Sequence, residues 1–389
     1  MRTGPIVHLT TFLQGGAGRA VTLLACAQRR AGHDVVVVTS RTPAPGYENY
    51  QEYLDTIAAA GCRLVQVDSL FKRDDGLNRA ALDSTRAALQ GQRPQLVHAH
   101  AAVPARIGLR LASRGCPVVQ TMHGWSRHKT PDQVAQDLDI MREVDLVVFP
   151  SAAAAEELRA AGGSFRATAI VPCGIPVGAP AAPLPAGLEH LQRRRAQGAR
   201  VLVTIGSLTR QKNHAVVIDA LPPLVERHDV IALLVGEGPE LPELRARTVD
   251  LGVSDRVHFA GYVAEASSVL AIADVLVQPS LTESFGIAVA EAFRAGVPVV
   301  ANNIPALAEL LAGGAYGWMF DGDDADDLVR TLDRGLRAPQ SEVADMTARA
   351  RRRFDDLFTE RRMVDGYAQA FEQAHVARGA AANADPAAD

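Results

Sequence analysis

A chain of 389 residues is longer than one hydrophobic core usually organises, so two domains are expected. Apolar residues make up 48% of the sequence and charged residues 22%, and a formal net charge of -4 argues against a global nucleic-acid binder. The four cysteines stand far apart without a Cys-x-x-Cys pair, so neither a zinc site nor a redox motif is indicated.

The sequence predicts a protein of the cytoplasm. Its start, MRTGPIVHLT, lacks the charged-then-apolar layout of a secretory signal, and the scattered cysteines suggest reduced thiols. No apolar run approaches the roughly 20 residues that a membrane span needs. Peripheral association with the inner membrane surface stays open, and the high alanine and arginine content suggests a GC-rich bacterial genome.

The N-terminal half alternates short apolar runs with amphipathic helical patterns such as Arg19–Ala31. The runs are rich in Val, Ile and Leu and are expected as buried parallel strands: Ile6–Leu9, Val35–Thr39, Leu64–Val67, Leu96–His98, Val118–Met122 and Leu146–Phe149. This alternation predicts right-handed crossovers and an α/β domain with a doubly wound sheet over residues 1–178.

The alternation breaks at residues 171–186, where a run of Pro, Gly and Ala is typical of a linker. After the basic stretch Arg193–Arg195 a second series of strands is expected: Val201–Ile205, Ile231–Val235, Val257–Ala260, Val275–Pro279 and Val297–Ala301. Residues 179–355 therefore form a second domain of the same class. A ligand would bind at the carboxyl ends of strands from both halves.

The C-terminal part predicts one more helix, over residues 356–376. Met363, Tyr367 and Phe371 recur at spacings of four residues, as on one face of a helix. We expect this helix to pack back toward the N-terminal domain. Residues 377–389 are rich in alanine with little to bury, and we expect them to be disordered.

Two glutamates near a predicted helix start carry the strongest functional signal. Glu283 stands in a loop after a strand, and a helix is expected from about Phe285 to Ala295, with Gly296 as its cap and Glu291 inside it. The carboxylates could accept hydrogen bonds from sugar hydroxyls, and the amides at the helix start could hold an anion. Taken alone, such a pair is more often a first-turn residue and a solvated helix residue.

The surrounding string changes that interpretation. Glu283-Ser-Phe-Gly-Ile-Ala-Val-Ala-Glu291, followed by Gly296-Val-Pro-Val-Val, resembles the Glu-x7-Glu signature of family 4 of the retaining glycosyltransferases. Gly206-Ser-Leu-Thr-Arg-Gln-Lys212 resembles the diphosphate-binding segment of that family. Weaker matches follow in order: Val235-Gly-Glu-Gly-Pro239, Val257-His-Phe-Ala-Gly-Tyr262, Gly15-Gly16-Ala17-Gly18 and His123-Gly124.

The resemblance covers about residues 1–375 and implies the GT-B fold, in which two Rossmann-like doubly wound parallel-sheet domains face each other across a cleft. The N-terminal domain would bind the acceptor and the C-terminal domain the nucleotide sugar. Glu283 would hold hydroxyls of the donor sugar, and Glu291 would hold the ribose. The remaining donor-binding groups would act mostly through their backbone: Gly206, Tyr262, Val263, Ser284, Phe285, Gly286 and Ile287.

The departing diphosphate needs positive charge, which Lys212 and Arg210 would supply. The family often carries an arginine directly after the glycine, where this chain has Ser207. Either Arg210 substitutes for that arginine or one cation is missing. No divalent metal and no other cofactor is implied.

In the N-terminal half, His123 follows a predicted strand. In the resembled family this histidine contacts the donor sugar and helps the transition state, rather than acting as a simple general base. Gly15 and Gly16 would let the backbone approach the donor closely. His98 and His100 also end a strand; a structural role is favoured for both, with His100 as an acceptor-side candidate.

The expected activity is retaining glycosyl transfer to a hydroxyl group, with a UDP-sugar favoured over a GDP-sugar. The predicted acceptor segments Arg41–Tyr53, Phe71–Asn78 and Trp125–Gln136 show no long apolar-basic face, which favours a small molecule or glycan over a lipid-linked acceptor. A GT-B epimerase or phosphorylase and a non-catalytic partner subunit are the alternatives.

The glycine spacing argues against a nicotinamide-dependent dehydrogenase, because it lacks Gly-x-Gly-x-x-Gly. The second strand is followed by Ser40 and Arg41, so no acid is placed for a ribose hydroxyl.

Overall fold

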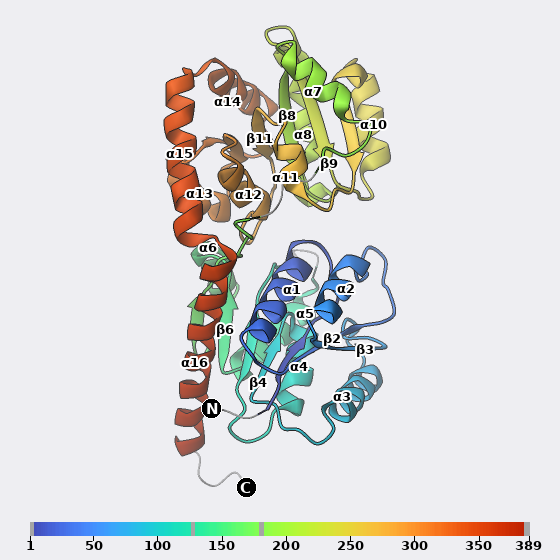
Figure 1. The fold of residues 1–389 in the computed structure, drawn as a ribbon, viewed down its shortest axis with the longest axis vertical. Coiled ribbons are helices and arrows are strands. Elements are labelled where there is room, and N and C mark those ends of the chain that lie inside the picture. Colours follow the sequence, from blue (N-terminus) through green and yellow to red (C-terminus); the bar gives the residue numbers. More distant parts are fainter. Residues whose placement is uncertain (1–3, 126–128, 179–182, 385–389) are drawn as a thin grey trace. The chain divides into compact units, whose positions relative to one another are not determined.

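The structure is a computed structural model that describes residues 4–125, 129–178 and 183–384. The chain divides into two compact units (Figure 1). Unit 1 comprises Met1–Gly174 together with Glu360–Asp389, and unit 2 comprises Ile175–Thr359. Each unit buries its own hydrophobic core, which is what lets a chain of this length fold as two bodies.

Unit 1 is built on a seven-stranded parallel sheet in the order β3-β2-β1-β4-β5-β6-β7. Its strands are β1 (Ile6–Leu9), β2 (Val35–Ser40), β3 (Arg63–Val67), β4 (Leu96–Ala99), β5 (Val118–Thr121), β6 (Leu146–Phe149) and β7 (Thr168–Ile170). Its helices are α1 (Gly15–Arg30), α2 (Gln51–Ala59), α3 (Asp75–Leu89), α4 (Ala102–Leu111), α5 (Pro131–Glu143), α6 (Ala152–Ala160) and α16 (Glu360–Ala384). Five of the strands (β1, β2, β4, β5 and β6) are buried along their whole length, because helices cover both faces of a parallel sheet.

Unit 2 has a six-stranded parallel sheet in the order β10-β9-β8-β11-β12-β13. Its strands are β8 (Arg200–Ile205), β9 (Val230–Val235), β10 (Val257–Gly261), β11 (Val275–Gln278), β12 (Val299–Asn302) and β13 (Trp318–Phe320). Its helices are α7 (Glu189–Ala196), α8 (His214–Asp219), α9 (Leu221–Val225), α10 (Leu241–Asp250), α11 (Ala266–Leu270), α12 (Ile287–Ala295), α13 (Pro305–Leu310), α14 (Ala325–Arg337) and α15 (Gln340–Leu357), with short 3-10 turns η1 (Arg210–Lys212), η2 (Ser254–Arg256) and η3 (Ala312–Gly314).

Every predicted strand is present, with ends that differ by at most two residues. Two three-residue strands were not predicted. β7 is only partly buried and β13 follows a glycine-rich turn, so neither shows the longer apolar run that marks the other strands.

Two predicted helix starts were wrong. α1 begins at Gly15 rather than Arg19, so the glycine-rich turn is the first turn of this helix. A Cβ on Gly18 would lie 2.5 Å from the backbone of Leu13, which explains a glycine there. α12 begins at Ile287 rather than Phe285, because Gly286 adopts a left-handed conformation before it; the predicted cap at Gly296 is confirmed.

α16 contributes to the core of unit 1 and lies beside β6 (Figure 1). Met363, Tyr367, Phe371 and Ala374 pack with apolar side chains of the sheet and of α1. The hydroxyl groups of Tyr367 and Thr121 are 3.0 Å apart. The helix runs to Ala384, past residue 376, because alanine is the best helix former; residues 385–389 of the predicted tail lie outside the described part.

Candidate functional site

The carboxyl ends of β8, β11 and β12 lie next to one another, because these strands are neighbours in the unit 2 sheet. The turn η1 follows β8, and the loop that carries Glu283 follows β11. Two segments that are about 70 residues apart in the chain therefore meet at one edge of the sheet. The Lys212 Nζ atom lies 2.5 Å from Glu283 Oε1.

One carboxylate oxygen of Glu283 accepts three hydrogen bonds. Besides Lys212, Gln278 Nε2 donates to Oε1 at 3.0 Å and Ser280 Oγ donates at 2.9 Å. Within the described residues all side-chain contacts of this carboxylate involve Oε1. Oε2 is therefore the oxygen with the most capacity left to accept a hydrogen bond from a hydroxyl group.

The donors to Glu283 are themselves fixed by the strand next door. Asn302, at the end of β12, donates from Nδ2 to the Ser280 carbonyl at 3.0 Å, and its Oδ1 accepts from the Gly322 amide at 2.9 Å. Gln278, Ser280 and Asn302 are at most 2% exposed. Sequence reasoning missed all three, although polar residues at the ends of apolar strands are a usable signal.

Glycines let the loops after β8 and β9 pack closely. A Cβ on Gly236 would lie 2.0 Å from the Gly206 carbonyl oxygen, and a Cβ on Gly238 would lie 2.2 Å from that of Leu208. The Lys212 side chain lies over Gly206, where a Cβ would be 3.3 Å from its Cδ. This packing directs the Lys212 ammonium toward Glu283.

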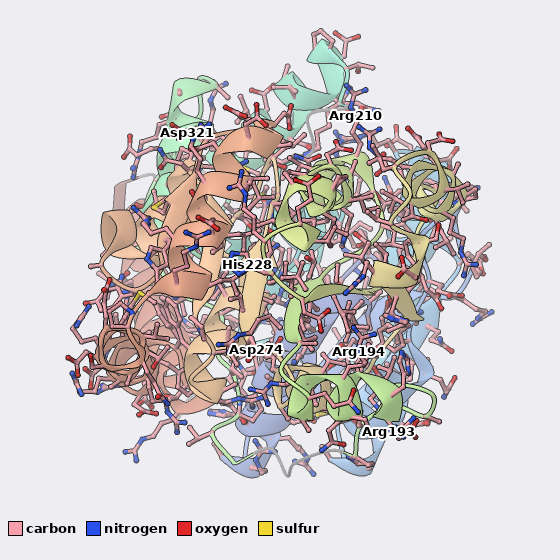
Figure 2. All side chains as sticks on the ribbon, turned by 90° about the horizontal axis from the view of Figure 1, so that it is seen from above. Arg193, Arg194, Arg210, His228, Asp274 and Asp321 are labelled. Atoms are coloured by element: carbon pink, nitrogen blue, oxygen red, sulfur yellow. The ribbon has the colours of Figure 1, made fainter. Side chains whose placement is uncertain are left out.

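Arg210 is exposed and forms no ion pair with any residue in the described ranges. Figure 2 shows it on the opposite side of unit 2 from Arg194 and Asp274. Asp274 directly precedes β11, at the amino end of the strand. Arg210 thus adds a positive charge to the carboxyl edge of the sheet, where Lys212 already lies, and its charge acts on the nearby carboxylate of Glu240.

The segment at the start of α12 is partly buried. Phe285 is 5% exposed and its ring packs edge-on against Phe358, with centroids 5.4 Å apart. Ser284 and Ile287 keep partial exposure. Glu291 is only 3% exposed, so it is buried within α12 rather than solvated.

At the end of β10, Tyr262 is 46% exposed and Val263 is partly exposed. The Tyr262 amide lies 3.4 Å from Glu237 Oε1. Gly261, with a positive φ of 68°, precedes this exposed turn.

In unit 1, His123 is hydrogen bonded to another histidine, since its Nε2 lies 2.9 Å from His100 Nδ1. Burial lowers the pKa of His123 to about 4, even though its side chain keeps partial exposure. Burial also holds the pKa values of His98 and His100 well below the ordinary range. These rings are therefore neutral at pH 7.

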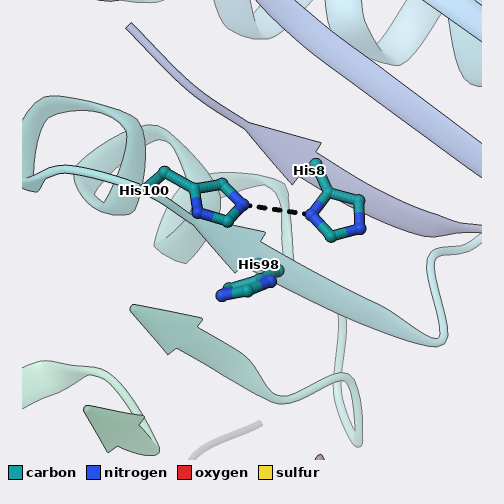
Figure 3. A group of neighbouring side chains, drawn as sticks. All are labelled: His8, His98 and His100. Carbon is teal, nitrogen blue, oxygen red and sulfur yellow. Dashed lines mark hydrogen bonds between the residues drawn. The ribbon is translucent and has the colours of Figure 1, made fainter. Parts of the chain in front are cut away.

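His8, His98 and His100 lie close enough together to offer nitrogens to one ion. One nitrogen from each ring lies within 4.8 Å of the others, and all three side chains are buried (Figure 3). The group contains no carboxylate. His8, inside the apolar strand β1, was not identified from the sequence.

Three aromatic rings from the loops after β1, β2 and β3 form one cluster. The ring centroids of Tyr47 and Phe71 are 4.9 Å apart, and Phe12 lies 5.6 Å from Phe71. Tyr47 is 47% exposed and Phe71 is 37% exposed, so the cluster presents an apolar surface. Of the predicted acceptor segments it includes parts of two; residues 126–128 of the third lie outside the described residues.

Two families match the chain. Residues 14–178 match the family described as Glycosyltransferase Family 4, and residues 189–353 match Glycosyl transferases group 1. A glycogen synthase of Mycobacterium tuberculosis is 30% identical over 372 residues, covering 87% of this chain and 84% of the relative. The chain belongs to the group 1, family 4 glycosyltransferases.

A further relative of this glycosyltransferase is the GDP-mannose-dependent alpha-(1-6)-phosphatidylinositol monomannoside mannosyltransferase of Mycolicibacterium smegmatis, 28% identical over 77% of this chain and 82% of the relative. The solved structure of Anabaena Alr3699/HepE in complex with UDP-glucose matches with a TM-score of 0.79 and 19% identity, over 95% of this chain and 100% of that one. Sucrose-phosphate synthase from Thermosynechococcus elongatus gives 0.78 at 19% identity, over 96% and 100%. The fold is GT-B.

The predicted site residues of this glycosyltransferase fall in two groups. Unit 2 brings Lys212, Gly206 and Glu283 into contact and carries the remaining donor-side residues. Unit 1 carries His123, and Gly15 and Gly16 as exposed residues of the first turn of α1. No helix among the described residues is long and apolar enough to cross a bilayer.

Proposed function

We propose that this glycosyltransferase moves a sugar from a nucleoside diphosphate sugar to a hydroxyl group, with retention of the anomeric configuration and without a metal ion. The contact between Lys212 Nζ and Glu283 Oε1 carries the proposal. It joins a cation suited to a diphosphate and a carboxylate suited to sugar hydroxyls on neighbouring loops.

The proposed chemistry needs charge rather than a protein nucleophile. As the bond between the sugar and the diphosphate breaks, negative charge grows on the leaving group and the sugar becomes oxocarbenium-like. Lys212 and the exposed Arg210 stabilise that negative charge, together with the amides at the start of α12. The acceptor oxygen attacks from the face that the diphosphate leaves, and the departing phosphate takes the acceptor proton.

The donor is proposed as a UDP-sugar, with a GDP-sugar as the alternative. The Anabaena structure holds UDP-glucose, which supports the first, and the mycobacterial mannosyltransferase is GDP-mannose-dependent, which supports the second. In both cases the diphosphate is shared, so the same cations would serve.

The acceptor is proposed as a hydroxyl of a small molecule or glycan, with a lipid-linked acceptor as the alternative. The exposed rings of Tyr47 and Phe71 support this choice, because flat aromatic faces stack on the apolar faces of sugars and of ring-containing small molecules.

A donor panel tests the proposal. A ligand that binds only the folded state raises the unfolding midpoint, so one nucleotide sugar should raise it while most do not. The same compound should then support transfer, give a product with the donor's anomeric configuration by NMR, and remain active in EDTA. Lys212→Ala should abolish the shift with the nucleoside diphosphate, whereas Arg227→Ala, at an exposed cation elsewhere in unit 2, should retain it. An inverted product or loss of activity in EDTA would overturn the retaining or the metal-independent part respectively.

A further inference from the structure

Four side chains of unit 1, from Gln28 to His123, are joined in a row by three successive hydrogen bonds. Gln28 lies on α1, His8 on β1, and His100 and His123 directly beyond β4 and β5. Gln28 Oε1 lies 2.7 Å from His8 Nε2, His8 Nδ1 lies 3.1 Å from His100 Nε2, and His100 Nδ1 lies 2.9 Å from His123 Nε2. Figure 3 shows the central link between His8 and His100.

The chemistry at one end sets the proton positions along the whole row. The Gln28 carbonyl oxygen can only accept, so His8 must carry its proton on Nε2. A neutral His8 then has a lone pair on Nδ1 and must accept from His100 Nε2. By the same step His100 accepts at Nδ1, and His123 donates from Nε2.

A protonated ring would disrupt this order of donors and acceptors, and burial keeps the rings neutral. It lowers the pKa of His8 to about 4, and the electrostatic neighbours of His100 are His8, His98 and His123. Gln28 is 6% exposed and His8 is fully buried, so bulk water does not compete for these bonds.

We propose that Gln28 and His8, acting through His100, hold His123 in the tautomer whose Nδ1 carries the lone pair. In this tautomer the Nδ1 atom of His123 is a hydrogen-bond acceptor. Gln28, His8 and His100 are positioning residues. Only the effect of this tautomer on sugar transfer rests on the proposed function.

A metal ion is the competing use of the same rings. Two of these rings are already joined by a hydrogen bond, since His8 Nδ1 lies 3.1 Å from His100 Nε2. A metal ion would also bring a double positive charge into a buried group of neutral rings without a carboxylate, which is costly. The hydrogen-bonded row satisfies both rings without that cost.

The test reads tautomers directly by long-range 1H–15N NMR of the full chain labelled with 15N-histidine, at pH 7.5 without ligand. His8, His100 and His123 should each show a protonated Nε2 and an unprotonated Nδ1. In the near-isosteric Gln28→Met variant, the Nδ1 and Nε2 signals of His123 should move toward each other as a second tautomer mixes in, and kcat should fall about 10-fold with little change in donor KM. The same substitution at the exposed Gln373 should change neither.

Gln28→Glu is a second test, in which the hydrogen bond from His8 to residue 28 is kept. A carboxylate still accepts from His8 but favours a charged ring, so the His8 and His123 signals should titrate together above pH 5. A protonated Nδ1 at His123 in the parent chain, His123 signals that ignore both substitutions, or stoichiometric Zn²⁺ binding at the His8 and His100 signals would overturn the inference. Because the NMR needs no donor, its result stands apart from whether sugar transfer is found.

Discussion

The Glu283 carboxylate is held through one of its two oxygens. Its Oε1 is held by Lys212, Gln278 and Ser280, which fixes the plane of the carboxylate before any donor arrives. A group held in place in this way loses little freedom when it takes up sugar hydroxyls, so its contribution should be felt in the transition state.

Replacing Glu283 by alanine should lower kcat/KM for transfer roughly 100-fold, or about 3 kcal/mol of transition-state binding. Steady-state kinetics with the identified donor measures this. Glu226→Ala removes an exposed carboxylate elsewhere in unit 2 and should leave kcat/KM unchanged. Near-native turnover in the Glu283 variant would remove this residue from the site.

At the residue scale, the resemblance of their surrounding strings predicted that Lys212 and Glu283 belong to one site, and the structure brings these two side chains into contact. It could not find Gln278 or Asn302, because their role depends on which strands are neighbours in the sheet rather than on any motif. His8 could have been noticed as a polar residue inside the apolar run Ile6–Leu9. The contacts of His8 depend on the tertiary structure and cannot be predicted from residue spacing.

The start of α12 depends on a backbone conformation that suits glycine. Gly286 has a φ of 106°, and a Cβ there would lie 2.8 Å from Leu307 Cδ2. Gly286→Ala should therefore lower the free energy of unfolding by roughly 2–4 kcal/mol, from backbone strain and overpacking together.

Urea unfolding of unit 2 checks this prediction. Gly296→Ala, at the other end of α12, is the matched control, because its φ is 70° but nothing lies within 4 Å of the added Cβ. It should cost only about 1 kcal/mol. Equal losses in the two variants would mean that the contact with Leu307 contributes nothing.

α16 should matter to the stability of unit 1 through one face only. Phe371 is 9% exposed and its ring meets His98 edge-on at 5.3 Å, whereas Val376 is 72% exposed. Phe371→Ala should lower the free energy of unfolding by about 3 kcal/mol and Val376→Ala by less than about 0.5 kcal/mol. Denaturant titration that finds the two variants alike would contradict the packing of this helix.

At the element scale, the strands were predictable because each is a continuous apolar run between turn residues. The starts of α1 and α12 could not be predicted, because both lie at glycines. A glycine has no side chain to contribute to an apolar pattern, and its φ angle depends on tertiary packing. The helix over residues 356–376 was recognised from one apolar face, although spacing alone did not give its full length.

The stability of the whole molecule should depend on pH through its buried histidines. Burial lowers the pKa values of His8, His123 and His214 to about 4. Between about pH 6.5 and pH 4 the unfolded chain binds protons that the folded chain does not, so the free energy of unfolding falls as the pH falls. Each such histidine contributes up to ~1.4 kcal/mol per pH unit.

Urea unfolding between pH 7.5 and pH 5.0 measures that slope. His214→Leu should lower this slope by the contribution of about one bound proton. His33→Gln, at an exposed histidine, should leave the slope unchanged. A stability that stays flat over this range would show that these rings are protonated in the folded protein or exposed to water.

At the scale of the molecule, two sheets of one class could be predicted from alternating strands and helices. The predicted division after residue 178 is close to the boundary at Gly174. The second predicted boundary, after residue 355, falls inside α15, which runs to Leu357. The apolar pattern of a helix does not show which of two hydrophobic cores it packs on. The sequence therefore gave no sign that the boundary lies after α15 rather than inside it.

Unit 2 is inserted into unit 1, and its two ends lie side by side, since Ile175 bridges to Thr359 and its amide donates to the Phe358 carbonyl at 2.9 Å. During synthesis, unit 2 is complete as soon as Thr359 has left the ribosome. The core of unit 1 still waits for Tyr367 and Phe371. All residues of unit 2 are therefore available for folding before those of unit 1, whereas domains usually become available in order from the N-terminus.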